Sequence, residues 1–280
     1  MRLQCGHHVL ELGRPVVMGI LNVTPDSFSD GGRYFELPRA IAQAERMAQE
    51  GAAIIDVGGE STRPGAAPVT PDEELRRVIP VVERLAETLA VPVSVDTRTP
   101  EVMRESIAAG ASMINDVSAL RAPGAIEAVA GSQTAVCLMH MQGEPRTMQN
   151  EPRYGNVLGE VREFLRERVE ECVGAGIARS RLVVDPGFGF GKTLEHNLEL
   201  LRGLPEIASD GLPVLAGLSR KRMIATLTGR DEGDRLAGSV ALAVIAAMRG
   251  VRIVRAHDVR ETVEALRIVV AAGAQLEGWQ

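Results

Sequence analysis

Aromatic residues and long apolar segments are scarce in this chain of 280 residues. Only 3% of the residues are Phe, Trp or Tyr, so the core has to be built from aliphatic side chains, which suit buried parallel strands and the helices that cover them. The longest apolar stretch, 236–248, is too short to cross a bilayer, which takes about 20 residues. The amino terminus shows no apolar signal segment with a small-residue cleavage site. We therefore expect a cytoplasmic protein that is not embedded in a membrane.

Cysteine and positive charge are also in short supply. Cys5, Cys137 and Cys172 are too widely separated for a metal-binding pattern, and an odd, sparse cysteine count is typical of a reducing compartment. Cys137 lies in an apolar run, which favours a buried small hydrophobe over a nucleophile. The net charge of -6 argues against a nucleic-acid partner. It leaves room for an anionic small molecule, because a few local Arg and Lys residues can outweigh the global sign.

What the sequence does contain is one unit repeated from end to end: a short apolar run, a polar or Gly-rich loop, and an amphipathic helical pattern. The apolar runs are 16–22, 53–58, 92–96, 112–116, 134–140, 181–185, 213–219 and 252–257. The helical patterns include 38–50, 71–89, 100–109, 156–175, 235–249 and 259–271.

This alternation predicts an α/β fold with a parallel sheet. Eight units in a chain of this length favour one closed (β/α)₈ TIM barrel over residues 1–280, with long βα loops at its carboxyl-terminal face. The alternative is an open, doubly wound sheet, which is weakened because no Gly-x-Gly-x-x-Gly motif follows the first strand. Thr70 and Thr99, each before a proline, are expected to cap helices. Gly51, Gly110 and Gly250 are expected to end them.

Each apolar run ends in a side chain that can do chemistry. These residues are Asn22, Asp56, Asp96, Asn115 with Asp116, His140, Asp185, Ser219, and Arg255 with His257. In a TIM barrel all these strand ends open on one face, and active sites lie on that face. For any single residue the alternative is a helix cap or a turn. Eight polar strand ends in register favour an active site.

Two polar loops follow the first two runs. Segment 18–32 reads MGILNVTPDSFSDGG, and a loop of this kind over a barrel mouth can close on a substrate with Phe28 as an apolar lid. Segment 58–65 reads GGESTRPG, in which glycines permit close backbone approach and Arg63 suits a phosphate or a carboxylate. The alternatives are a surface excursion and a turn with a solvated Arg.

In their order and spacing, these two loops resemble the signature segments of the dihydropteroate synthases. The likeness covers about residues 8 to 275 and continues through SVDTR (94–98), INDVS (114–118), LMHMQGEPRTMQ (138–149), DPGFGFGKT (185–193), GLSRK (217–221) and RAHDV (255–259). The stretch 187–193 also resembles a phosphate-binding P-loop, but a P-loop requires glycine where Pro186 stands.

The resemblance implies a transferase of folate biosynthesis. Such an enzyme condenses 6-hydroxymethyl-7,8-dihydropterin pyrophosphate with p-aminobenzoate, forms a C–N bond, and releases 7,8-dihydropteroate and pyrophosphate. It also implies a Mg²⁺ ion held mainly by the pyrophosphate and faced by Asn22, competition by sulfonamides for the p-aminobenzoate pocket, and a homodimer. The helical segments 236–248 and 259–271 could supply the dimer interface, or could equally cover the barrel.

The same resemblance assigns roles to individual residues. The implied pterin-binding residues are Asp56, Asp96, Asn115, Met139, Asp185, Phe190 and Lys221. The implied pyrophosphate-binding residues are Asn22, Arg63, Arg255 and His257. The implied p-aminobenzoate-binding residues are Phe28, Ser61, Thr62, Pro64, Phe190, Ser219 and Lys221. The implied catalytic residues are Asp96, Lys221 and Arg63. Asp96 would stabilise a pterin cation if the C–O bond breaks before the amine attacks.

Two other functions share the barrel and the pterin-binding acids. One is a pterin-binding, corrinoid-dependent methyltransferase, which has no use for a p-aminobenzoate lid or a pyrophosphate site. The other is a non-catalytic pterin-binding paralogue, which would be expected to lose loop residues that are present here. Arg220 and Arg222 flank Lys221, and both are interpreted as solvated charges.

Overall fold

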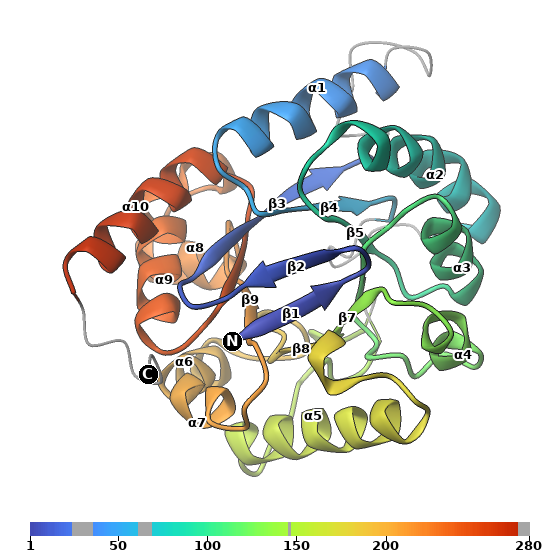
Figure 1. Cartoon of the computed structure of the whole chain (residues 1–280). Helices are drawn as coiled ribbons and strands as arrows, with labels where there is room; N and C mark the ends of the chain where they lie inside the picture. The colour runs from blue at the N-terminus through green and yellow to red at the C-terminus, as the bar shows by residue number, and fades with distance from the viewer. Residues whose placement is uncertain (24–35, 61–68, 145–146, 274–280) are drawn as a thin grey trace.

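The computed structural model describes residues 1–23, 36–60, 69–144 and 147–273, and its centre is a ring of parallel strands surrounded by helices (Figure 1). The strands are β3 (Val16–Asn22), β4 (Ile54–Gly58), β5 (Val93–Asp96), β6 (Met113–Asp116), β7 (Ala135–Met139), β8 (Leu182–Asp185), β9 (Leu215–Gly217) and β10 (Ile253–Ala256). The helices are α1 (Glu36–Gln49), α2 (Pro71–Thr88), α3 (Pro100–Ala108), α4 (Ala125–Ala130), α5 (Val157–Gly174), α6 (Leu194–Arg202), α7 (Leu204–Ala208), α8 (Arg222–Thr228), α9 (Leu236–Met248) and α10 (Val259–Ala271).

The strand order around the sheet is β8-β7-β6-β5-β4-β3-β10-β9. A parallel bridge between Val184 and Val214 joins the two ends of this order, and the amide of Val184 donates to the carbonyl of Pro213 at 3.0 Å. Pro213 has no N–H that could donate a further hydrogen bond between these two strands. The pairing of β8 with the start of β9 is therefore limited to this one bridge. The prediction of a TIM barrel is confirmed, and the open-sheet alternative is wrong.

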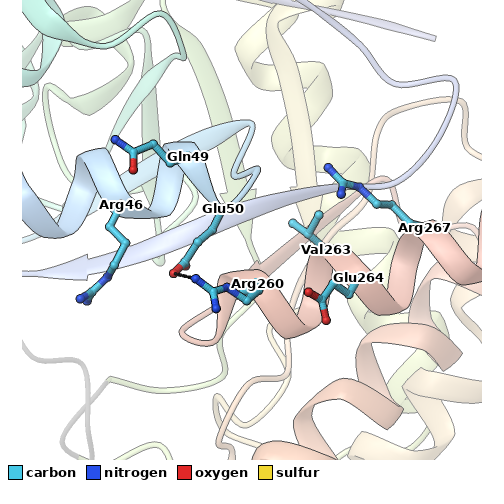
Figure 2. A pocket seen from close by; sticks show the side chains of 7 residues that line it. All are labelled: Arg46, Gln49, Glu50, Arg260, Val263, Glu264 and Arg267. Atoms are coloured by element: carbon cyan, nitrogen blue, oxygen red, sulfur yellow. Dashed lines mark ion pairs between the residues drawn. The ribbon is translucent and has the colours of Figure 1, made fainter.

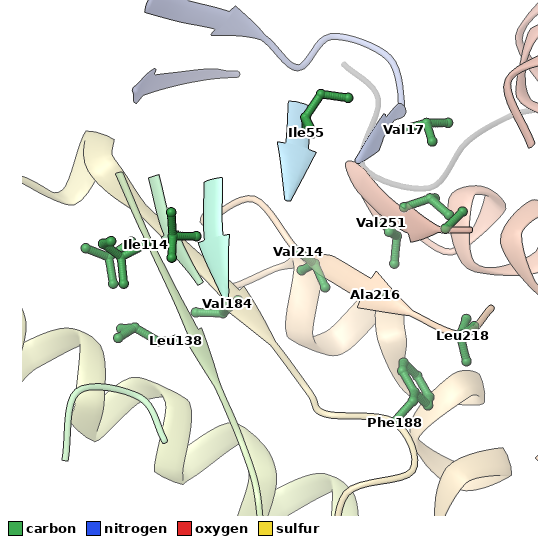
Figure 3. Packing of buried hydrophobic residues seen from close by; sticks show 14 of the residues in the cluster. Val17, Ile55, Ile114, Leu138, Val184, Phe188, Val214, Ala216, Leu218 and Val251 are labelled. Atoms are coloured by element: carbon green, nitrogen blue, oxygen red, sulfur yellow. The ribbon is translucent and has the colours of Figure 1, made fainter. Parts of the chain in front are cut away.

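The strands bury both of their faces, as expected for a parallel barrel. Successive side chains point to opposite faces. Ile54 and Met113 therefore belong to an inner apolar cluster, whereas Ile55 and Ile114, one residue later, belong to the large cluster between the strands and the helices (Figure 3). This alternation decides which strand-end residues face the barrel interior.

A two-stranded antiparallel hairpin precedes the barrel, formed by β1 (Arg2–Cys5) and β2 (His8–Glu11). In Figure 1 it lies across the middle of the ring. Leu3, Cys5 and Leu12 are fully buried in the inner apolar cluster, so this hairpin plugs the barrel interior. No pattern in the sequence predicted this hairpin.

The predicted helix ends are mostly confirmed. The Thr70 side chain accepts from the amide of Glu73 and caps α2, whereas the Thr99 side chain makes no cap and donates instead to Glu74 at 3.1 Å. Thr99 is therefore the N-cap residue of α3, as predicted, but its side chain does not form the capping hydrogen bond. The three predicted terminal glycines have left-handed φ values of 103° for Gly51, 101° for Gly110 and 95° for Gly250.

All three cysteines are buried and none is in a disulfide, which confirms the interpretation of Cys137 as a small hydrophobe. Within the residues that the structure describes, no helix is both long enough and apolar enough to span a membrane. The predicted single domain over residues 1–280 stays a prediction, since residues 274–280 lie outside the described part.

Candidate active site at the carboxyl-terminal end of the barrel

The strand-end polar residues fall into two groups according to the face they occupy. Asp56 lies two residues after Ile54, and Asp185 two residues after Val183, where both apolar residues are inward-facing. The same spacing of two relates Asn115 to Met113 and Arg255 to Ile253. Because side chains alternate along a strand, these polar groups lie on the interior side, directly beyond the inner apolar cluster.

An arginine between two carboxylates occupies the centre of this group. Arg255 donates through Nε to Asp56 Oδ2 at 2.6 Å and through Nη2 to Asp96 Oδ2 at 2.8 Å. Asn115 donates through Nδ2 to the same Asp56 oxygen at 3.1 Å. Asp56 is 0% exposed, and its other oxygen, Oδ1, has no hydrogen-bond partner among the described residues. A buried carboxylate oxygen without a partner is costly, which favours a ligand N–H at this position.

The pKa values of ionisable side chains at the mouth of the barrel are strongly shifted. Burial raises the pKa of Asp96 to about 7, against the opposing effect of Arg255. Burial opposes the charge on Arg255, but Asp56 and Asp96 outweigh it and raise the pKa of the guanidinium. Perturbed ionisable groups in a shared cleft are a mark of functional sites.

A lysine, an aromatic ring and a third carboxylate form the other side of the mouth. Lys221 Nζ lies 4.1 Å from the centroid of the Phe190 ring, a cation–π contact. Burial lowers the pKa of Lys221 to about 8, and Arg255 acts in the same direction. Burial raises the pKa of Asp185 to about 6, although the amide of Gly187 donates to its Oδ1 at 2.7 Å. Met139 and Phe190 are both buried in one small apolar cluster.

The structure also brings Ser219 and His257 together. Ser219 Oγ lies 3.0 Å from His257 Nδ1, and the amide of His257 donates back to the same hydroxyl at 3.3 Å. Asn22 ends β3 beside Gly58 of β4, and its Oδ1 is 3.7 Å from where a Cβ on Gly58 would lie. These half-buried polar groups end strands of the same barrel as the central carboxylates.

Two of the strand-end residues do not belong to this group. Asp116 is fully buried and accepts from the amides of Ser118 and Leu120, each at 2.7 Å. His140 is buried and packs edge-on against Phe164, with ring centroids 4.9 Å apart. Each stands one residue after an inward-facing neighbour, so it falls on the opposite face. The interpretation of all strand ends as one active-site set was wrong for these two.

Phe28, Ser61, Thr62, Arg63 and Pro64 lie outside the described residues.

Of the two arginines beside Lys221, Arg220 pairs with Asp258, with Nη2 2.5 Å from Oδ1, and Arg222 is exposed at the start of α8. Lys192 lies within the motif DPGFGFGKT (185–193), to which the sequence assigned no role for this lysine. Its side chain is 3% exposed.

Two surface hollows lie away from the mouth. One, of about 270 Å³, lies between α1 and α10 and is lined by charged side chains such as Arg46, Glu50 and Arg260 (Figure 2). The other, of about 310 Å³, lies between α5 and α7. Neither contains an inward-facing strand-end residue, so the barrel mouth remains the candidate active site.

The fold and the charged mouth define a TIM-barrel enzyme, and the comparisons with known proteins narrow the class. The family model described as "Pterin binding enzyme" matches residues 18–257. The chain is 56% identical over 262 residues to the dihydropteroate synthase of Escherichia coli (strain K12), covering 94% of this chain and 93% of that protein. It is 48% identical to that of Haemophilus influenzae, covering 96% and 98%.

Solved structures agree with these relatives. The Yersinia pestis dihydropteroate synthase with a sulfonamide drug complex superposes with a TM-score of 0.93 at 53% identity, covering 98% of this chain and 99% of that one. The Xanthomonas albilineans enzyme in complex with 7,8-dihydropteroate superposes with a TM-score of 0.90 at 52% identity, covering 98% and 99%. The chain belongs to the dihydropteroate synthases, a family of pterin-binding transferases.

Proposed function

We propose that this chain condenses 6-hydroxymethyl-7,8-dihydropterin pyrophosphate with p-aminobenzoate to give 7,8-dihydropteroate and pyrophosphate. The observation that carries the proposal is the meeting of Asp56, Asp96, Asn115 and Arg255 in one hydrogen-bonded cluster at the barrel mouth. Structures of the Xanthomonas albilineans relative, with a TM-score of 0.92 for the 4-aminobenzoic acid complex, support both substrates.

The pterin edge matches the groups that the mouth presents. A pterin offers adjacent N–H donors and a carbonyl acceptor, and Asp185 with the unpartnered Asp56 oxygen can accept from the donors. Lys221 can donate to the carbonyl, and Asn115 supplies an amide. Charge-assisted hydrogen bonds of this kind contribute roughly 1.5–3 kcal/mol each. Phe190 and Met139 would pack against the ring.

The reaction proceeds, in this proposal, by cleavage of the methylene C–O bond before attack. The electron pair leaves with the pyrophosphate, the methylene becomes cationic, and the aryl amine nitrogen then forms the C–N bond and loses a proton to water. Asp96 stabilises the cation. Arg255 neutralises Asp96 without ligand, at 2.8 Å, and a pyrophosphate would offer this guanidinium another anionic partner. Asp96 would then regain its full effect on the developing positive charge.

The leaving pyrophosphate needs positive charge and hydrogen-bond donors. We assign Asn22, Arg63, Arg255 and His257 to it. The described residues contain no group of three or more His, Cys, Asp or Glu side chains that could hold a metal ion. The amide oxygen of Asn22 fits a Mg²⁺ ion that takes most of its ligands from the pyrophosphate and water. When bound, such an ion would offset charge on the leaving group.

The p-aminobenzoate is assigned to the outer part of the mouth. Its carboxylate would lie near Ser219 and Lys221, and its ring would pack against Phe190, Phe28 and Pro64, with Ser61 and Thr62 in the same pocket. Sulfonamides should compete there. In steady-state kinetics, competition between a sulfonamide and p-aminobenzoate would support this placement. A sulfonamide that does not compete would contradict it.

We also assign the protein to the cytoplasm as a homodimer. The apolar helix α9 exposes Leu236 at 42%, Ile245 at 39% and Met248 at 45%, a face that a second copy could cover. Light scattering of the purified protein should give twice the chain mass. Ile245→Glu should give the monomer, whereas Val9→Glu, at an exposed position of the β1–β2 hairpin, should not. A wild-type monomer would exclude the dimer.

The proposed reaction is tested by measuring pyrophosphate release with Mg²⁺ and dihydropterin pyrophosphate, with and without p-aminobenzoate. Release that depends on p-aminobenzoate and yields dihydropteroate is the expected result. Pterin binding without turnover would favour a non-catalytic paralogue, and failure to bind the pterin would overturn the proposal.

A further inference from the structure

The loop between β8 and α6, residues 186–193, is wrapped around a buried lysine. The chain has only two lysines, Lys192 and Lys221, and Lys192 is 3% exposed. No carboxylate among the described residues forms an ion pair with it. Its ammonium group lies instead among acceptors supplied by the loop itself and by the end of β7.

Four acceptors surround the three hydrogens of the ammonium, and the most distant of them is the carbonyl of His140 at 3.4 Å. Lys192 Nζ lies 2.9 Å from His140 Nδ1, 2.9 Å from the carbonyl of Gly187 and 3.0 Å from the carbonyl of Phe190. Burial lowers the pKa of His140 to about 3, and Lys192 acts in the same direction. The imidazole is therefore neutral, and its Nδ1 can accept. An ammonium has three donors, and all three are used.

Two glycines in the backbone around this ammonium have no room for a side chain. Gly187 has a φ of 70°, and a Cβ there would lie 1.9 Å from the carbonyl oxygen of His140. Gly191 has a φ of 61°, and its Cβ would lie 2.4 Å from the carbonyl oxygen of Gln142. The amide of Gly189 donates to Asn197 Oδ1 at 2.7 Å. The loop is therefore held by several directional contacts, and Lys192 makes three of the short ones.

These contacts lead directly to the proposed pterin pocket. Lys192 binds the carbonyl of Phe190, whose ring supports the Lys221 ammonium at 4.1 Å. It also binds the carbonyl of Gly187, whose amide donates to the Asp185 carboxylate. One buried group thus connects to both sides of the pocket without contacting the pterin position itself.

We propose that Lys192, with His140 as its neutral acceptor, is a positioning residue that holds Asp185, Phe190 and Lys221 in the geometry that binds the pterin. The inference deepens the proposed function and rests on the pterin pocket assigned there. It also gives a role to His140 and Lys192, which the proposed reaction itself does not use.

The first test compares two buried cations that bind backbone carbonyls. Lys192→Met removes the proposed positioning group. Arg181→Met is the matched control. Arg181 is also 3% exposed and donates to the carbonyls of Thr134 and Val129 at 2.9 and 3.0 Å. It precedes β8, however, whereas Lys192 follows β8 on the side of the proposed pterin pocket. The readouts are the Kd of 6-hydroxymethylpterin by calorimetry and the melting temperature.

We expect both variants to melt at lower temperature. Only Lys192→Met should weaken pterin binding, by at least about tenfold, because small misplacements of binding groups are costly. Hydrogen exchange of the amides in 187–191 should also accelerate in Lys192→Met alone. Wild-type affinity in Lys192→Met, or equal losses in the two variants, would overturn the proposal.

If Lys192→Met does not fold, two variants of His140 test the positioning role instead. His140→Asn can keep an acceptor for Lys192, whereas His140→Leu cannot. Affinity for the pterin should fall in His140→Leu and return in His140→Asn, and equal affinities would overturn the acceptor role. Asp185→Asn separates this inference from the pocket on which it rests. If Asp185→Asn binds the pterin like the wild type, the pocket assignment fails. If Asp185→Asn loses binding and Lys192→Met does not, only the positioning role fails.

Discussion

At the scale of single residues, Asp96 lies where positive charge would develop. It is held at 2.8 Å by Arg255 and has a pKa raised by burial to about 7. Asp96→Asn keeps the shape of the side chain and removes its charge. We expect kcat to fall by at least about 10²-fold, in the range found for groups that act on transition-state charge. The Kd of the pterin should change by no more than about threefold.

Single-turnover kinetics and calorimetry on the same preparation separate the two effects. Equal losses in kcat and in pterin affinity would assign Asp96 to ground-state binding.

The pH dependence of the reaction tests a second residue, Lys221. Asp185 has to be ionised to accept from the pterin, and its pKa is about 6. Lys221 has to be protonated to donate, and its pKa is about 8. The profile of kcat/KM for the pterin substrate reports the free enzyme. The value of kcat/KM should rise as pH increases through about 6, where Asp185 loses its proton. The rise should continue towards pH 7, where Asp96 loses its proton. The value should fall as pH increases through about 8, where Lys221 loses its proton.

Lys221→Arg keeps the positive charge at every pH in this range. It should therefore remove the part of the alkaline limb near pH 8 and leave the acid limb unchanged. Burial lowers the pKa of Lys192 to about 7, so a fall through that pH that remains in the variant would belong to Lys192. An unchanged fall near pH 8 would assign that part of the limb to a group other than Lys221.

At the scale of elements, the loop after β8 shows how backbone geometry fixes a sequence motif. Gly187 and Gly211 both have left-handed φ values, 70° and 83°, but a Cβ on Gly187 would meet a carbonyl oxygen at 1.9 Å, whereas one on Gly211 would meet nothing within 4 Å. Gly211→Ala should lower the free energy of unfolding by about 1–2 kcal/mol through backbone strain alone. Gly187→Ala should add roughly 1–3 kcal/mol from the steric conflict.

Chemical denaturation of both variants measures this difference. Gly187→Ala should also lose pterin affinity, while Gly211→Ala should retain it. If the two variants were equally stable, the close approach between Gly187 and His140 would not limit the loop.

The elements themselves were largely predictable, because their signals are local. The run 16–22 coincides with β3, and the pattern 259–271 coincides with α10. Short elements such as α7 (Leu204–Ala208) carry too few residues for a periodic pattern and were not predicted. The hairpin of β1 and β2 was missed for another reason: its place is set by the opening that it fills, and this opening exists only once the barrel has closed.

At the scale of the whole molecule, that hairpin completes the core. Leu3 is fully buried in the inner apolar cluster, whereas Val9, in the same hairpin, is 52% exposed. Leu3→Ala should lower the free energy of unfolding by about 2–5 kcal/mol, and Val9→Ala by less than about 0.5 kcal/mol. Because the hairpin packs against the inner apolar cluster rather than the mouth, kcat should stay within about twofold of the wild type in both.

Thermal and chemical unfolding, with steady-state kinetics on the folded fraction, measure both effects. A large loss of kcat in a folded Leu3→Ala protein would show that the plug and the mouth are coupled.

The sequence by itself determined the alternation of strands and helices, the placement of polar residues at strand ends, and the resemblance to the dihydropteroate synthases. All three depend on local patterns. Only the tertiary structure decided that Asp116 and His140 face away from the mouth, because the face is set by each strand's register within the ring. It also decided that Arg255 pairs with Asp56 and Asp96, residues 199 and 159 positions away. Contacts at such separations exist only when the barrel closes and brings its strand ends together.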